Sequence, residues 1–208
     1  MFLSTSLILD GYKRGIFPMA ESADDPFIFW VSPEKRGIIK MDEFYIPKSL
    51  KKFIKKNNYD IFVNKNFKEV ITRCAKTSKG RKETWINDQI KENYCKLFSE
   101  GHALSIECYE NNNLIGGLYG VKLGAIFFGE SMFSSKVNAS KVALVYLVAY
   151  LKQGGFKIID TQFLTRHLKQ FGAIEITKSN YLNVLKKNLQ ITTKFPLTLN
   201  KAVLDYFT

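Results

Sequence analysis

The sequence has few cysteines and histidines, and this scarcity argues against several kinds of site. Its three cysteines, Cys74, Cys95 and Cys108, are odd in number and widely spaced, and none forms a Cys-x-x-Cys pair. A disulfide framework and a zinc site are therefore not indicated, and we expect buried free thiols. The two histidines, His102 and His167, stand far apart without an obvious ligand partner. We expect no metal, and both imidazoles to be structural.

Long hydrophobic runs are also missing. The longest useful run, from Val142 to Leu151, is shorter than the roughly 20 residues that cross a bilayer. The N-terminus has neither a basic opening segment nor an unbroken apolar stretch, so it does not resemble a signal peptide. We therefore expect a soluble, cytoplasmic protein that does not associate with membranes.

Acidic residues are scarce relative to basic ones. The chain has 31 Lys and Arg against 19 Asp and Glu, a formal net charge of +12. A positive field of this kind favours a polyanionic partner such as nucleic acid, although a Lys-rich surface that only maintains solubility is the alternative. The apolar content of 46% is typical of a folded globular protein, so the whole chain should fold.

Glycine and proline punctuate the first sixty residues, and their spacing permits only short elements there. Phe27–Val31 and residues 37–39 are predicted strands, and Ser49–Lys56 is a predicted basic helix. Longer units follow. We therefore expect a small N-terminal domain over residues 1–58 and a larger domain over residues 59–208, packed closely because no flexible linker separates them.

The larger segment combines strands with helices. Residues 103–109, 114–123 and 125–132 are predicted strands in a row, which favours an antiparallel meander. Residues 138–153 carry apolar side chains at helical spacing and end at Gly154-Gly155, so this helix should pack on the sheet. The architecture is therefore predicted to be mixed, α+β or α/β. The remaining predicted elements are strands at 59–63, 156–162 and 173–176 and helices at 67–75, 87–99, 165–171 and 179–188.

Several segments have residue types that core patterning does not explain. At these segments the chain resembles the leucyl/phenylalanyl-tRNA–protein transferases, in unbroken order from about Gly11 to Tyr181. The resemblance implies a small N-terminal domain joined to a C-terminal domain with the acetyltransferase-like (GNAT) fold. The segments are Gly11–Met19, Trp30–Gly37, Thr84–Ile86, Leu114–Val121, Phe127–Phe133 with Asn138–Lys141, and Ile159–Gln162.

The resemblance also implies an activity. Members of this family move Leu or Phe, with Met as a further donor, from aminoacyl-tRNA to the α-amine of proteins that begin with Arg or Lys. This transfer marks the acceptor proteins for degradation by the N-degron pathway. No metal or small cofactor is expected, and a monomer is the default.

Apolar residues at matching positions of the family line the site for the Leu or Phe side chain. Here they are Leu118, Phe127, Leu144 and Leu151, which periodicity alone would place in an ordinary core. Loss of burial, about 0.8 kcal/mol per methylene, would then discriminate against smaller aminoacyl groups.

Four glycines, at positions 116, 117, 120 and 124, are costly in a plain strand because glycine contributes no packing and loses much backbone entropy. They predict close approach of a ligand. The alternative is a β-bulge or tight turn that serves only the fold.

Asp160 and Gln162 are two residues apart on a predicted strand, so both side chains should point to one face. The family places its Asp-x-Gln at the reacting centre, whereas a strand-end cap is the alternative from the residues alone. We expect Asp160 to hold and help deprotonate the attacking amine, and Gln162 to orient it or to stabilise the oxyanion. Glu130 is a second candidate, either for holding an ammonium group or as a buried, hydrogen-bonded carboxylate.

Trp30 and Trp85 lie in motifs whose family equivalents contact the 3′-terminal adenosine of tRNA, and an exposed indole can stack on a base. The alternative is a core position. The family often has a second Trp where this chain has Val31. Clusters of basic residues could contact acceptor-stem phosphates, which provide affinity without sequence information. They are Lys51-Lys52, Lys55-Lys56, Lys79, Arg81-Lys82 and Lys186-Lys187.

Two other functions compete with this one. An acyl-CoA-dependent acetyltransferase would share the implied fold, but the sequence has no Arg/Gln-x-x-Gly-x-Gly/Ala loop to bind the pyrophosphate. A non-catalytic RNA-binding module would fit the charge but leaves Asp160, Gln162 and Glu130 unexplained. No role is predicted for residues 190–208.

Overall fold

The computed structural model describes residues 3–56, 59–76 and 83–207. Lys79, Arg81 and Lys82, which form part of the predicted basic clusters, lie outside the described residues. The elements are α1 (Thr5–Lys13), β1 (Phe17–Met19), β2 (Phe29–Val31), β3 (Lys35–Lys40), η1 (Met41–Glu43), α2 (Lys48–Lys56), β4 (Asp60–Val63), α3 (Phe67–Ala75), α4 (Asp88–Ser99), β5 (Ala103–Glu110), β6 (Asn113–Leu123), β7 (Ile126–Ser134), α5 (Ala139–Gln153), β8 (Ile158–Gln162), α6 (Arg166–Lys169), β9 (Ile174–Thr177), α7 (Lys178–Leu189) and η2 (Val203–Phe207).

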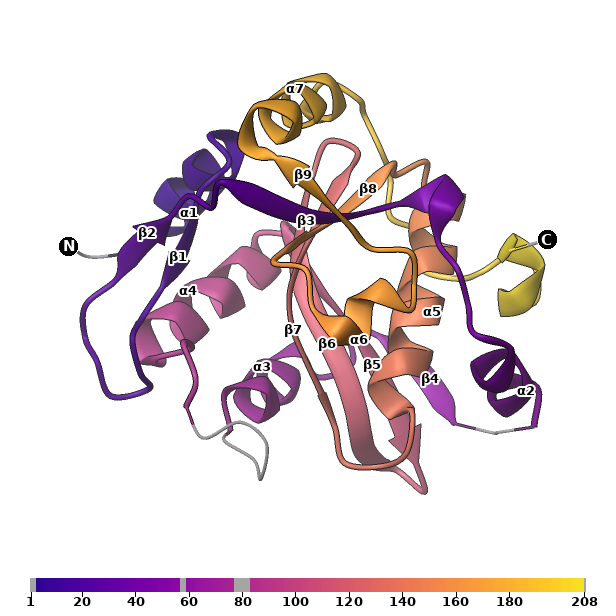
Figure 1. Cartoon of the computed structure of the whole chain (residues 1–208). Coiled ribbons are helices and arrows are strands. Elements are labelled where there is room, and N and C mark those ends of the chain that lie inside the picture. Colours follow the sequence, from indigo (N-terminus) through magenta and orange to yellow (C-terminus); the bar gives the residue numbers. More distant parts are fainter. Residues whose placement is uncertain (1–2, 57–58, 77–82, 208) are drawn as a thin grey trace.

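One sheet of seven strands, in the order β4-β5-β6-β7-β8-β3-β9, organises the described chain (Figure 1). Neighbouring strands are antiparallel except β7 and β8, which run parallel and are joined through α5. The parallel pairing ends at Phe128 and Asp160, although β7 continues to Ser134. The outer half of β7 therefore leaves β8, and an opening forms between the two strands.

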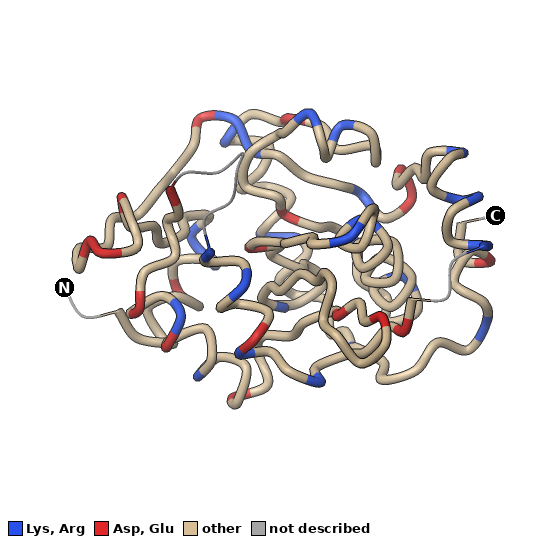
Figure 2. Tube along the Cα trace, turned by 90° about the horizontal axis from the view of Figure 1, so that it is seen from below, with Lys and Arg blue, Asp and Glu red and all other residues tan. Residues whose placement is uncertain are grey.

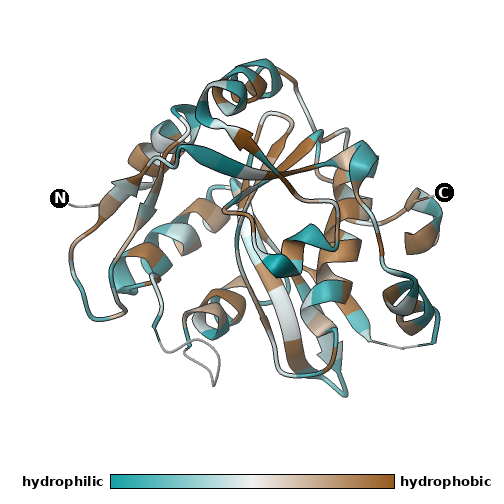
Figure 3. Ribbon diagram, in the orientation of Figure 1, coloured by the Kyte–Doolittle hydropathy of each residue, from teal (hydrophilic) through white to brown (hydrophobic). Residues whose placement is uncertain are grey.

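The strands separate two cores because successive side chains point to opposite faces. Leu118 and Phe127 pack with α5 on one face, whereas Tyr119 and Phe128 pack with α1, α3, α4 and α7 on the other. The apolar colouring of α5 in Figure 3 reflects its burial against the sheet. The predicted meander of β5, β6 and β7 is confirmed, as is the mixed α and β architecture with a small N-terminal part.

The N-terminal part contains α1 and the antiparallel β1–β2 pair. α1 was not expected from the sequence. It begins where Ser4 accepts a hydrogen bond from the Leu7 amide, and it contains Gly11, whose missing Cβ would lie only 2.2 Å from Trp30 Cζ3. β3 belongs to the predicted segment 1–58, yet it pairs with β8 and β9 in the main sheet. The segment therefore contributes to both parts, and the division at residue 58 stays a prediction.

The C-terminal tail, for which no role was predicted, covers the end of α5. The Phe195 ring stacks on Tyr150, with centroids 5.5 Å apart, and the Tyr206 hydroxyl donates to Gln153. Basic residues lie on many elements rather than in one stripe (Figure 2), and α2 alone carries Lys48, Lys51, Lys52, Lys55 and Lys56. Among the described residues, no helix is long and apolar enough to cross a membrane.

The predicted glycine cluster is approached by the chain itself. A Cβ on Gly116 would lie 2.6 Å from Ala139 Cβ, and one on Gly120 would lie 2.2 Å from the Phe128 carbonyl oxygen. The register of β6 with β7 also shifts between Tyr119 and Gly120. The expectation of a close ligand is therefore wrong for these two positions, and the alternative of packing and a bulge holds.

Gly120→Ala should lower the free energy of unfolding by about 1–3 kcal/mol, because the added methyl group overpacks the β6–β7 contact. Urea unfolding would measure this loss. Gly129→Ala is the matched control, since its Cβ would meet no atom closer than 3.5 Å. Equal stability of the two variants would contradict the packing argument.

Candidate active site

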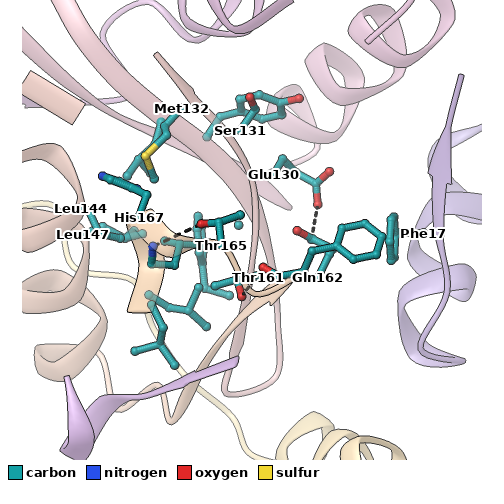
Figure 4. Close-up of a pocket in the computed structure, with 18 of the residues that line it drawn as sticks. Phe17, Glu130, Ser131, Met132, Leu144, Leu147, Thr161, Gln162, Thr165 and His167 are labelled. Carbon is teal, nitrogen blue, oxygen red and sulfur yellow. Dashed lines mark hydrogen bonds between the residues drawn. The ribbon is translucent and has the colours of Figure 1, made fainter. Parts of the chain in front are cut away.

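A pocket of about 340 Å³ lies where β7 and β8 separate (Figure 4). β7 and β8 form two of its walls, and α5 and α6 contribute others. Phe17 and Met19 of β1 line it from the N-terminal part, together with Trp85, which precedes α4. Much of the remaining lining is apolar, from Ile39, Leu118, Phe127, Met132, Leu144, Leu147, Ile159 and Leu168. Such a surface suits an aliphatic or aromatic side chain.

Glu130 and Gln162 place two hydrogen-bonded polar side chains in this largely apolar pocket. The Gln162 amide Nε2 donates to Glu130 Oε1 at 3.3 Å. A dashed line marks this hydrogen bond in Figure 4. Gln162 has a φ of 57°, and such left-handed backbone costs of order 1–3 kcal/mol for a residue other than glycine. Its N–H donates to Asp160 Oδ1 at 2.9 Å, which stabilises this conformation.

The left-handed backbone changes the predicted geometry of the Asp-x-Gln motif. Ile159 and Thr161 line the pocket, and Asp160 between them does not. Gln162 reaches the pocket because its positive φ interrupts the strand alternation. The expectation that both side chains share one face therefore differs from the structure.

Asp160 is fully buried and engaged on both oxygens. Arg36 donates from Nε to Oδ1 at 2.9 Å and from Nη2 to Oδ2 at 2.8 Å. The Tyr181 hydroxyl donates to Oδ2 at 2.5 Å. A carboxylate held in this way has no free oxygen directed at the pocket, and its link to the lining is the hydrogen bond from the Gln162 N–H.

Glu130 is held by two buried tyrosines. Tyr12 of α1 donates to Oε1 at 2.6 Å, and Tyr94 of α4 donates to Oε2 at 3.0 Å. Burial raises the pKa of Glu130 to about 7. The two hydroxyl hydrogen bonds oppose this shift, and the nearby charges of Asp160 and Arg36 act in opposite directions. Glu130 therefore changes its charge near neutral pH.

The pocket brings together most of the nine site residues that the sequence predicted. Glu130, Gln162, Leu118, Phe127, Leu144 and Trp85 line it. Asp160, Leu151 and Trp30 do not: Leu151 is fully buried in the core beside the sheet, and the Trp30 indole packs over Gly11.

Four further residues of the site were missed at the level of sequence. Arg36, Tyr12 and Tyr94 are buried polar residues behind the pocket, and His167 lines it. Tyr12 and Arg36 lie inside motif segments, which was a usable signal, whereas nothing in the sequence joins Tyr94 to Glu130. Burial and the charge of Lys141 lower the pKa of His167, which favours the neutral imidazole. The described part of the chain contains no group of three or more metal-ligating side chains.

Two family models match the chain. The model for leucyl/phenylalanyl-tRNA protein transferase matches residues 38–186, and the model for the N-terminal domain of the same transferase matches residues 1–34. The chain belongs to the leucyl/phenylalanyl-tRNA protein transferase family. This is a family of aminoacyltransferases, which act on aminoacyl-tRNA and protein substrates.

Two solved structures show distant similarity to this family member. A protein described as L-PGS from Bacillus licheniformis is 14% identical with a TM-score of 0.44, over 94% of this chain and 60% of that one. A functionally unknown conserved protein from Staphylococcus epidermidis ATCC 12228 is 10% identical with a TM-score of 0.40, over 84% and 65%. The chain thus spans less than two thirds of each of these proteins.

Arg36→Met should lower the free energy of unfolding by roughly 3–5 kcal/mol, because it leaves the Asp160 carboxylate buried without its cation. Chemical denaturation would measure the change. Lys40→Met is the matched control, because Lys40 pairs with Glu43 at 2.9 Å on the surface and an exposed pair contributes about 0–1 kcal/mol. A loss at Arg36 no larger than that at Lys40 would contradict the role given to the buried pair.

Proposed function

We propose that this chain moves Leu or Phe, with Met as a further donor, from aminoacyl-tRNA to the α-amine of proteins that begin with Arg or Lys. The product would be a substrate of the N-degron pathway of degradation. One observation carries the proposal: the pocket combines an apolar wall with the Glu130–Gln162 pair. An aminoacyl ester has the same division, an apolar side chain next to a polar reacting centre.

The apolar wall would select the donor. Leu118, Phe127 and Leu144 would surround the side chain of the aminoacyl group, and Met132 and Leu147 extend the same surface. Each methylene that a smaller donor lacks would reduce binding by about 0.8 kcal/mol. Selection by burial accounts for a preference for large apolar residues without any direct reading of the tRNA sequence.

Gln162 would orient the acceptor amine. Its amide nitrogen donates to Glu130, which leaves the amide carbonyl oxygen to accept a hydrogen bond from the amine. The reaction requires the amine to attack the ester carbonyl carbon and the 3′-terminal ribose to leave, and correct orientation supplies much of the rate of such a step. Asp160 would be a positioning residue, because it holds the Gln162 backbone and lies outside the pocket.

Trp85 is the better placed of the two tryptophans to stack on the terminal adenosine. It lines the pocket beside Met19, whereas Trp30 packs on α1. The lysines of α2 are available for phosphate contacts, which would add affinity that falls as the salt concentration rises.

The direct test uses Leu-tRNA carrying labelled Leu and a peptide that begins with Arg. Transfer of the label to the peptide is expected, with little transfer to the same peptide beginning with Ser. Absence of transfer from Leu-tRNA and Phe-tRNA alike would overturn the proposed function.

Gln162→Ala should lower the single-turnover rate by about 10²-fold, the loss expected when a reacting group is misplaced by about 1 Å. Gln153→Ala is the control, because Gln153 contacts the tail at Thr198 and does not line the pocket. A rate for Gln162→Ala close to that of the parent, with the fold intact, would remove Gln162 from the mechanism.

A further inference from the structure

Two tyrosine hydroxyls and one carboxyl group form a closed triangle of close contacts at the polar end of the pocket. The Tyr12 hydroxyl oxygen lies 2.6 Å from Glu130 Oε1, and the Tyr94 hydroxyl oxygen lies 3.0 Å from Glu130 Oε2. The two hydroxyl oxygens are 2.5 Å apart. Each distance is that of an O–H···O hydrogen bond. The triangle joins α1, α4 and β7, so three elements distant in sequence meet at one carboxyl group.

Three hydrogen bonds need three protons, and two hydroxyls supply only two. When Glu130 is ionised, both tyrosines can donate to it, and the contact between the two hydroxyls then contains no proton. When Glu130 is protonated, its proton can go to Tyr94, that of Tyr94 to Tyr12, and that of Tyr12 to the other carboxyl oxygen. The triangle is therefore complete only when Glu130 carries a proton.

Both tyrosine hydroxyls keep their protons at neutral pH, so only Glu130 changes the number of protons in the triangle. Tyr12 and Tyr94 are fully buried. Burial is the main reason why the pKa of both hydroxyls lies well above its usual value, and the charge of Glu130 adds to it. The charged groups that face Glu130 are Asp160 of β8 and Arg36 of β3, which are paired with each other. Glu130 is thus the group in the triangle that gains or loses a proton near neutral pH.

We propose that Tyr12 and Tyr94 are positioning residues that form, with Glu130, a ring that accepts the proton released by the acceptor amine. This inference rests on the proposed function. The acceptor arrives as an ammonium ion, and Glu130 takes one of its protons, which completes the ring. The nitrogen lone pair then forms the C–N bond with the ester carbonyl carbon. The C–O bond to the ribose breaks, and the ribose oxygen receives a second proton from the amine.

The proton affinities of donor and acceptor are matched. An α-amine has a pKa of about 7.7–8.0, and the pKa of Glu130 is raised to about 7. Proton transfer between groups of similar pKa is the condition in which a general base is effective at neutral pH. Asp160 cannot serve in the same way, because it does not line the pocket and its charge is paired with Arg36.

The test is the pH dependence of single-turnover transfer from Leu-tRNA to an Arg-initiated peptide. The parent rate should rise with pH through a midpoint near 7. Both hydroxyl hydrogen bonds lower the pKa of Glu130, because a hydrogen bond to the ionised carboxylate is stronger than each neutral one in the protonated ring. Tyr12→Phe and Tyr94→Phe should therefore each move the midpoint to higher pH, by up to about one unit. Near the new plateau, the rate should return toward that of the parent.

Tyr109→Phe is the matched control. Tyr109 is also buried and also donates to a buried carboxylate, Glu107, at 3.0 Å, but neither residue lines the pocket. Its midpoint should equal that of the parent. Parent-like midpoints in Tyr12→Phe and Tyr94→Phe would overturn the ring, even if their plateau rates are lower, because a merely structural loss leaves the midpoint in place.

A second measurement separates this inference from the proposed function. Carbon-13 NMR of labelled glutamate follows the Glu130 carboxyl group directly, and loss of the signal in Glu130→Gln identifies it. A titration near neutral pH in the parent protein is expected whether or not transfer is observed. If Glu130 titrates in the ordinary range of glutamate, the ring is overturned. This measurement uses the parent protein, so it holds even if the tyrosine variants fail to fold. Absence of transfer with a neutral titration would overturn the proposed function and with it the role of the ring in catalysis.

Discussion

Arg36 and Asp160 join β3 to β8 through hydrogen bonds of 2.8 to 3.2 Å in a region without solvent access. A buried charge of this kind is tolerated only when it is paired and hydrogen-bonded. Here the carboxylate of Asp160 is well satisfied, because it also accepts hydrogen bonds from the Tyr181 hydroxyl and the Gln162 N–H. The unusual backbone of Gln162, and with it the direction of its amide, depends on this arrangement.

The same arrangement explains why the pocket is where it is. β7 and β8 pair only over their first residues and then separate, and the bulge of β3 against β8 lies at the same level, between Gly37 and Ile38. α5, which connects the two parallel strands, supplies Leu144 and Leu147 to the opening. The apolar wall thus comes from the sheet and its crossover helix. Glu130 and Gln162 come from the parts of β7 and β8 that no longer pair with each other.

The N-terminal part completes the site rather than standing beside it. Phe17 and Met19 line the pocket, and Tyr12 reaches Glu130 from α1. Tyr12 and Tyr94 hold Glu130 from α1 and α4, so its geometry depends on the packing between the N-terminal part and the sheet. In the proposed mechanism, that packing is a requirement of the chemistry.

Local signals in the sequence predicted most helices and strands, because caps and periodicity act within a few residues. The side chain of Asn87 caps α4, and α3 begins and ends at the predicted residues. The place of β3 in the main sheet was not predictable in this way, because pairing between Ile38 and Asp160 is set by tertiary packing. Glu130 and Gln162 were found through their motifs. The sealing of Asp160 was not, since no local signal joins it to Arg36 and Tyr181. Strand alternation also could not anticipate the positive φ that brings Gln162 into the pocket.

We propose that one pocket binds the apolar aminoacyl side chain next to the Glu130–Gln162 pair. The decisive experiment is a crystal structure with a non-hydrolysable phenylalanyl-adenosine analogue. The phenyl ring is expected between Leu118 and Leu144, the aminoacyl carbonyl beside Gln162, and the adenine against Trp85. An analogue bound outside this pocket, or bound with its phenyl ring directed away from Leu144, would rule out this pocket as the donor site.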